Sequence, residues 1–216
     1  MNAWFGVKKY LVASGFYVLS QAVAAAQLNA TIADAQGAPL DDAVVALIPA
    51  QQPDYNSLPT AIMDQRQNMF VPKVLAIRTN TQVRFPNSDD VRHHVYSFSL
   101  AKRFELRLYQ GTPSEPVIFD KPGVVVLGCN IHDWMVGYIY VTDDPWFAVS
   151  DATGTLHLDA LPAGRYQVTL WHPQMTDLLP QAGADIELPA AGLQLCLPVR
   201  VGNAAVATPP AAPASA

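Results

Sequence analysis

Charged residues are scarce in this chain of 216 residues, at 14% of the total, and acidic residues outnumber basic ones by 18 to 13. No basic run and no stripe of basic and aromatic residues occurs, so nucleic acid is not expected to be the main partner. Beyond residue 26 the chain also lacks segments with the 3.6-residue period of an amphipathic helix. No apolar run in that part is long enough to span a bilayer. These absences leave a fold built from strands and turns.

Apolar and turn-forming residues are abundant instead. Half of the sequence is hydrophobic, and it contains 18 prolines and 12 glycines. This composition suits a β-rich fold with many turns and does not suit disorder. The length allows one large domain or two small ones. The sequence therefore predicts an all-β protein.

The first 26 residues have the pattern of an export signal. Lys8 and Lys9 precede an apolar run over residues 10–19, and small residues at 22–26 provide cleavage positions. An uncleaved membrane anchor is the alternative, but the run is short and interrupted by Ser14. We expect cleavage, a periplasmic location, and no stable membrane insertion of the mature chain.

A group of potential metal ligands lies between two predicted strands, at residues 124–127 and 136–141. Cys129, His132 and Met135 follow one another with two residues between each pair. A thiolate and an imidazole bind copper in both oxidation states, and a thioether is the usual distant axial partner in a blue-copper site. Such a site needs one more histidine.

Two adjacent histidines at the start of an upstream strand are the candidates for this ligand. They follow a strand at residues 82–85 and a polar turn. Strand alternation places their side chains on opposite faces. The face of His94 carries Tyr96 and Phe98 and is the more apolar one, so periodicity alone favours His94 over His93.

At these residues the chain resembles the cupredoxins, the small blue-copper electron carriers of the plastocyanin, amicyanin and pseudoazurin type. The resemblance covers residues 66–143. In that family an Asn-x-Asp-like turn precedes a His-Asn-Val segment whose histidine is the first ligand, and the other ligands follow on one loop. The residues that match the upstream pattern are Asn87, Asp89, His93 and Val95.

The resemblance implies one type 1 copper, held by His93, Cys129, His132 and Met135. The loop has the short ligand spacing typical of amicyanin. His94 stands where the family usually has Asn, and the family pattern favours His93 as the ligand.

Other roles for the cysteines and histidines stay open at this point. A disulfide between Cys129 and Cys196 would destroy the site, because the ligand must be a free thiolate. Cys196 lies in the run 193–198, which reads as a core strand, so a buried inert thiol is expected there. His172 and Met175 offer one further imidazole and one further thioether, which is weak support for a second copper site.

The segments on either side of this stretch resemble two halves of another fold, the carboxypeptidase-regulatory-like sandwich. Residues 149–171 contain an Asp-x-x-Gly turn and a Leu-Pro-x-Gly-x-Tyr motif of its second half, and residues 34–45 match its first half. The resemblance implies a cupredoxin Greek-key β-sandwich inserted in a second small β-sandwich. Strands at 44–48 and 167–171 should then share a sheet or face each other. The alternative is an N-terminal strand pair that extends the cupredoxin sheet.

The expected domain boundaries follow from this arrangement. They are a signal peptide at 1–26, the first part of the regulatory-like sandwich at 27–50, the cupredoxin copper domain at 51–145, the second part of the regulatory-like sandwich at 146–203, and a disordered tail rich in Ala and Pro at 204–216.

The leading functional hypothesis is a periplasmic type 1 copper protein, not an enzyme, that carries single electrons between a redox donor and a redox acceptor protein. The chain is also similar to sequences named after methylamine utilisation. The alternative is a copper-handling or cell-surface binding protein in which the copper is not an electron carrier. Handling sites tend to be Met-rich and open, and only one Met here has ligand spacing. A copper oxidase would need a vacant position and a second histidine-rich cluster.

Overall fold

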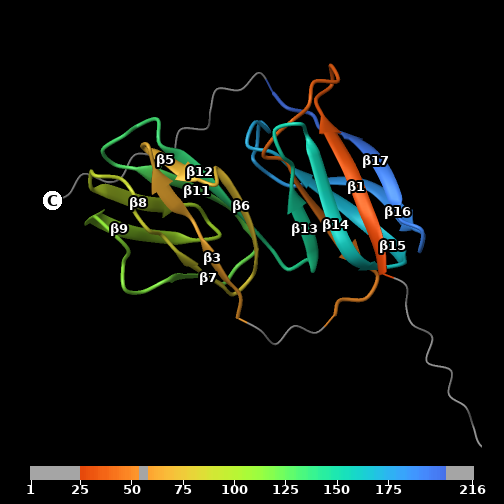
Figure 1. Cartoon of the computed structure of the whole chain (residues 1–216), viewed down its shortest axis with the longest axis horizontal. Coiled ribbons are helices and arrows are strands. Elements are labelled where there is room, and N and C mark those ends of the chain that lie inside the picture. The colour runs from red at the N-terminus through yellow and green to blue at the C-terminus, as the bar shows by residue number, and fades with distance from the viewer. Residues whose placement is uncertain (1–24, 54–57, 203–216) are drawn as a thin grey trace, which may run out of the picture.

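The computed structural model describes residues 25–53 and 58–202, which form seventeen β-strands and no helix (Figure 1). The prediction of an all-β protein is therefore confirmed for these residues. Within the described ranges no helix is long and apolar enough to cross a membrane.

Segments from the beginning and the end of the described chain form one sandwich of two sheets. The three-stranded sheet has the order β14 (Thr155–Pro162), β1 (Ala25–Ala33), β17 (Leu193–Pro198). The four-stranded sheet has the order β13 (Trp146–Val149), β2 (Val44–Pro49), β15 (Gly164–Trp171), β16 (Gln181–Leu188). Alternate side chains of β1 are buried, as expected for a strand with one face on a core.

Strands β2 and β15 are antiparallel neighbours, with Val44 opposite Trp171 and Ile48 opposite Gln167. The predicted pairing of residues 44–48 with residues 167–171 is therefore confirmed. It overrules the alternative in which the N-terminal strands extend only the middle sheet.

The middle of the chain forms the cupredoxin-like sandwich. Its five-stranded sheet has the order β6 (Val74–Arg78), β12 (Val136–Thr142), β11 (Gly123–Cys129), β8 (His93–Phe98), β9 (Arg103–Tyr109). Its three-stranded sheet has the order β10 (Val117–Phe119), β7 (Thr81–Arg84), β3 (Thr60–Ile62), and a hairpin is formed by β4 (Asp64–Arg66) and β5 (Met69–Val71). The core between the sheets includes Phe85, Phe119, Leu127 and Ile139, all at most 2% exposed.

The apolar segment at residues 69–78 forms two strands, β5 and β6, and not one. Pro72 lies between them, and proline has no N–H group with which to continue a strand ladder. The division places β5 in the hairpin and β6 at the edge of the five-stranded sheet. Phe70 of β5 then lies over Gly137 of β12, where a Cβ atom would come within 2.8–2.9 Å of the Phe70 side chain.

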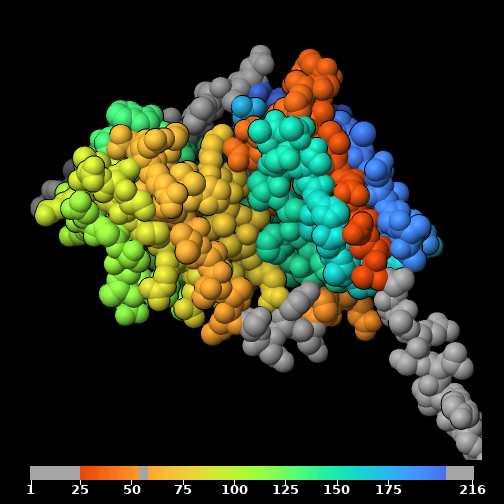
Figure 2. All heavy atoms as spheres, viewed as in Figure 1, coloured from red at the N-terminus to blue at the C-terminus, as the bar shows by residue number. Residues whose placement is uncertain are grey.

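The two sandwiches share an apolar seam, and they lie directly against each other in the space-filling view (Figure 2). The fully buried Trp171 of β15 contacts the rings of Tyr138 and Tyr140 of β12, with centroids 5.7 and 5.8 Å apart. An ion pair between Lys73 and Asp42 crosses the same seam, with N and O 3.1 Å apart. Burial of both tyrosine rings raises the pKa of each hydroxyl. The seam therefore packs like a protein core.

Two expected segments lie mostly outside the described residues. Of the signal peptide expected at residues 1–26, residues 1–24 lie outside the described range. Ala25 and Ala26 are described, and they pair with Pro162 and Leu161 at the start of β1. The tail from 204 to 216 lies wholly outside them.

Candidate metal centre

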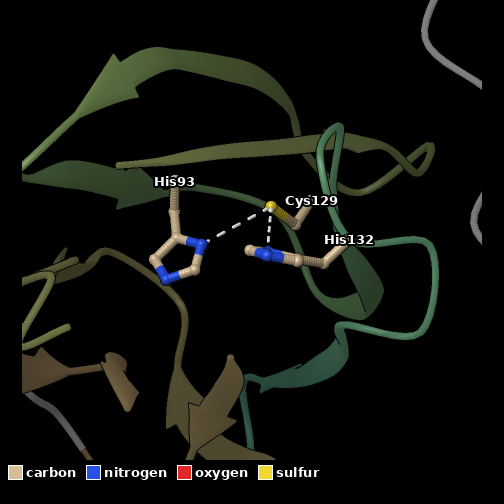
Figure 3. A group of neighbouring side chains, drawn as sticks. All are labelled: His93, Cys129 and His132. Atoms are coloured by element: carbon tan, nitrogen blue, oxygen red, sulfur yellow. Dashed lines mark hydrogen bonds between the residues drawn. The ribbon is translucent and has the colours of Figure 1, made fainter. Parts of the chain in front are cut away.

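Three of the four predicted ligands converge on one point. Donor atoms of His93, Cys129 and His132 all lie within 4.8 Å of one another. The Nδ1 atom of each histidine is 3.8 Å from the Cys129 Sγ atom, and both rings turn this nitrogen toward the sulfur (Figure 3).

Two neighbouring strands and one short loop create this convergence. His93 is the first residue of β8, and Cys129, the last residue of β11, pairs with Val95 of β8. The loop after Cys129 is fixed by hydrogen bonds from the Asn130 N–H to the His94 carbonyl and from the Met135 N–H to the His132 carbonyl. The first bond ties the start of the loop to β8, the second closes the loop on itself, and the chain continues directly into β12 at Val136.

The site is closed on its inner side. His93 is 0% exposed and Cys129 is 3% exposed, while His132 is half-buried. Met135 is 1% exposed and belongs to the same apolar core as Cys129. The Met135 side chain therefore lies in the same core as the Cys129 thiol.

Phe85 and Val95 pack in the core that contains Cys129. Tyr138 does not, because alternation along β12 turns it to the opposite face of the sheet, where it meets Trp171. Tyr138 therefore does not shield the site.

The outer nitrogen of His93 is bound by a carboxylate. Its Nε2 atom lies 2.8 Å from Asp89 Oδ2, and it can donate to that oxygen only when protonated. The Nδ1 atom facing Cys129 then carries a lone pair. Burial opposes ionisation of Asp89, but hydrogen bonds from the Asn68 and Gln67 amides and from His93 outweigh it and hold the pKa of Asp89 below its ordinary value.

His94 lies on the other face of β8. Its Nε2 atom is 2.9 Å from Glu105 Oε1, without the alignment of a hydrogen bond, and its ring meets Tyr96 edge to face. The structure therefore gathers His93, not His94, with Cys129 and His132.

The donor set fits copper. It consists of one thiolate, two imidazoles and one thioether, which is a cluster typical of a type 1 copper site. The two Nδ1–Sγ separations of 3.8 Å bring these donors close enough together to bind one metal ion. Neither cysteine forms a disulfide, so the Cys129 thiol is free to bind metal.

A polar network behind the site joins Asn87 to Tyr109 and Gln65, two residues that the sequence did not single out. The Asn87 side-chain amide donates to the carbonyls of Val91 and Tyr109. The Tyr109 hydroxyl donates to the Phe85 carbonyl and also contacts Gln65. Burial raises the pKa of Tyr109 to about 12. This network holds in place the turn that positions the Asp89 carboxylate against the His93 ring. Asn87 had a sequence signal in the Asn-x-Asp turn, whereas Gln65 had none.

The exposed edge of the site is aromatic. The ring of Trp134 is 70% exposed, and its centroid lies 5.2 Å from that of His132. Ile131 beside it is also exposed, at 47%. The half-buried imidazole of His132 thus connects the buried thiol to an apolar patch on the surface.

His172 and Met175 do not form a second centre of the same kind. The His172 Nε2 atom donates to the Asp41 carbonyl at 2.9 Å, and its Nδ1 atom accepts from the Gln174 N–H at 3.1 Å. Both ring nitrogens are therefore occupied, and none is left for a metal.

Cys196 is exposed, so the expectation of a buried thiol at this position was wrong. It lies on β17, an edge strand, where alternation turns Cys196 outward with Gln194 while Leu197 points into the core.

No protein-family model and no curated protein matches the chain. Solved structures do. A purple cupredoxin from Nitrosopumilus maritimus is 23% identical over 39% of this chain and 99% of its own, with a TM-score of 0.34. A reduced Cu(I) form of an amicyanin variant is 16% identical over 47% of this chain and 99% of its own, with a TM-score of 0.34.

A copper-containing nitrite reductase from Thermus scotoductus is 27% identical over 54% of this chain, with a TM-score of 0.36. The match spans only 28% of that enzyme. Because all three TM-scores are below 0.5, the functional conclusion depends on the donor atoms themselves.

Proposed function

We propose that this protein is a type 1 copper protein that carries single electrons between redox partners. The observation that supports it most directly is the placement of two imidazole Nδ1 atoms 3.8 Å from one buried thiol. Copper bound there would accept and release one electron by alternating between Cu(I) and Cu(II).

The protein holds the four donor side chains in fixed positions. His93 is fixed by β8 and Asp89, Cys129 by its pairing with β8, and His132 and Met135 by the short loop hydrogen bond between them. Donors that keep their positions in both oxidation states need little rearrangement when an electron moves. The apolar core around Met135 also excludes water, which limits the site to electron transfer.

The route to a partner is through His132. Its ring is the ligand closest to solvent, and Trp134 beside it offers an apolar contact for transient docking. Asp133 contributes a charge at the same edge. The partners are one donor and one acceptor protein, each brought within reach of this edge.

The rival proposal is a copper-handling protein. Its metal would exchange rapidly, whereas a buried thiolate site closed by Met135 is expected to retain copper. An enzymatic role is not proposed, since the described residues contain no second group of three His, Cys, Asp or Glu donors. The nitrite reductase match alone gives no support for catalysis.

The location and the second sandwich complete the proposal. The sequence pattern of residues 1–26 favours export to the periplasm. The sandwich of β1, β2 and β13–β17 is proposed to be carboxypeptidase-regulatory-like and to serve as a platform that fixes how the copper edge is presented. The continuous core at the Trp171 seam supports a fixed arrangement.

The decisive experiment is the visible spectrum of the purified protein with Cu(II), followed by a reversible one-electron titration. An intense thiolate-to-copper band that disappears on reduction and returns on oxidation is expected. A colourless Cu(II) protein would end the type 1 proposal. A coloured protein that loses its copper to a mild chelator within one redox cycle would favour copper handling.

A further inference from the structure

The carboxylate of Asp89 contacts His93, one of the proposed ligands. Its Oδ2 atom lies 2.8 Å from His93 Nε2 and 3.0 Å from the Asn68 amide nitrogen, and its Oδ1 atom lies 2.6 Å from the Gln67 amide nitrogen. The backbone N–H of Asp89 donates in turn to Asn87 Oδ1. The carboxylate is therefore held from one side by backbone amides while the other side faces the imidazole.

The amides come from the tip of the β4–β5 hairpin. Gln67 and Asn68 have φ angles of 52° and 57°, so both are left-handed, as in the two-residue turns that suit a twisted hairpin. Successive N–H groups in such a turn point to one side and form a small anion-binding concavity. The hairpin is itself anchored, because Phe70 packs over Gly137 and Asp64 accepts from the Ser88 hydroxyl. The position of Asp89 is thus set by a segment more than twenty residues away.

We propose that Asp89, held by the amides of Gln67 and Asn68, is a positioning residue that fixes the tautomer and ring orientation of His93 and favours the Cu(II) state. The preference for Cu(II) rests on the proposed function, whereas the control of the His93 tautomer and orientation does not. A carboxylate can contact Nε2 only as an acceptor, so it keeps the proton there and leaves the lone pair on Nδ1. His93 is 0% exposed, so bulk water does not reach its ring while Asp89 is in place. An anionic partner also makes the imidazole a stronger donor to the more highly charged metal ion.

The first test uses the metal-free protein. Long-range ¹⁵N–¹H NMR of the His93 ring reports which nitrogen carries the proton. We expect the Nε2–H tautomer alone in the natural protein and in Asp89→Asn, whose amide oxygen still accepts, and a mixture of tautomers in Asp89→Ala. The matched control is Asp64→Asn, which removes a buried hairpin carboxylate that does not touch His93. It is expected to keep the single tautomer.

The second test adds Cu(II) and Cu(I) under competition with chelators of known affinity. Loss of such an outer hydrogen-bond partner typically costs about 10–100-fold in metal affinity. We expect that loss for Cu(II) in Asp89→Ala, a smaller loss for Cu(I), and therefore an upward shift of the reduction potential. Asp89→Asn should keep the tautomer and still raise the potential, because only the charge is removed.

A single Nε2–H tautomer in Asp89→Ala would overturn the positioning role. So would an equal effect from Asp64→Asn, because the hairpin as a whole would then be responsible. An unchanged potential in Asp89→Asn would overturn the preference for Cu(II). A tautomer change in Asp89→Ala without any blue Cu(II) site would leave the positioning role intact and refute the proposed function instead.

Discussion

Two turns with the sequence His-x-x-Met occur in this protein, and they are alike in several respects. In each, the Met N–H donates to the His carbonyl at 3.0 Å: Met135 to His132 and Met175 to His172. Both methionines are buried, at 1% and 3% exposed. Both turns follow closely on a strand of a sheet, β11 or β15.

The two turns differ in what their imidazoles face. The Nδ1 atom of His132 faces the thiol of Cys129, and a second histidine faces the same thiol. Both nitrogens of His172 are taken by backbone groups, and its pKa is lowered by burial and by nearby Lys73 despite the hydrogen bond to Asp41. A metal site is therefore distinguished from a structural turn by unoccupied donor atoms, and the ligand spacing alone does not show which one is present.

The largest expected effect is at the thiol of Cys129, which the imidazole of the first turn faces. Cys129→Ser should abolish the blue colour while the fold is retained, because only a thiolate gives the strong charge-transfer band and serine is close in shape. Absorption and circular dichroism spectra of the copper-loaded protein provide the measurement. Cys196→Ser is the control and should stay blue. Loss of colour in the control, or colour in Cys129→Ser, would refute the ligand assignment.

The next effect concerns the two adjacent histidines. His93→Ala should lose tight copper binding because it removes one donor from the group of three. His94→Asn should keep it, since the His94 ring faces Glu105 and Tyr96 on the opposite side of β8. Competition titrations with Cu(II) measure both. The reverse pattern, or equal losses, would transfer the ligand role to His94.

A change in the second turn should alter stability and leave copper untouched. His172→Ala removes the hydrogen bonds to the Asp41 carbonyl and from the Gln174 N–H, and at about 0.5–1.5 kcal/mol for each bond the expected loss of stability is about 1–3 kcal/mol. Denaturant unfolding checks the loss, and the visible spectrum should not change. The exposed His157 serves as the control, with an expected effect of His157→Ala within about 0.5 kcal/mol. A changed copper spectrum in His172→Ala would show that the two turns are more alike than their contacts indicate.

The smallest effect is the pH dependence of the second turn. The pKa of His172 is lowered from its ordinary value of 6.5 in the folded protein, so the unfolded chain takes up the proton first. His172 therefore contributes full stability above pH 6.5, and this contribution falls as the pH drops below 6.5 toward the folded pKa. One proton limits the slope to about 1.4 kcal/mol per pH unit.

Unfolding free energies of the natural protein and of His172→Gln, compared from pH 7.5 to pH 5, isolate this contribution, because the other histidines cancel in the difference. Parallel curves would contradict a neutral buried His172.

The sequence was sufficient for the ligand group because three of the ligands lie on one short loop. Cys129, His132 and Met135 need only the closure of that loop to come together. The choice between His93 and His94 was different. Alternation correctly placed them on opposite faces of β8, but both faces of this interior strand are buried, so the more apolar face was not the face of the site.

Contacts between distant segments could not be read from the sequence. The amides of Gln67 and Asn68 reach Asp89 from the tip of the β4–β5 hairpin, which lies more than twenty residues away in the sequence. The exposure of Cys196 likewise depends on its lying on the outer face of the sheet, beside the exposed Thr31 of β1, which the apolar composition of residues 193–198 does not reveal. The pairing of β2 with β15 was predictable because both halves carry their own turn motifs.

The chain order of the outer sandwich has a consequence for synthesis on the ribosome. Leu28 of β1 pairs with Leu158 of β14 and with Leu193 of β17, both of which emerge more than a hundred residues later. At about 5–20 residues per second, β1 waits several seconds or longer with its apolar face and both edges uncovered. The middle sandwich can close during that interval, because its strands all lie between Thr60 and Thr142. The nascent chain therefore passes through a stage with one finished sandwich and two strands, β1 and β2, that still lack sheet partners from later in the chain. Aggregation at that stage is the hazard that this chain order creates.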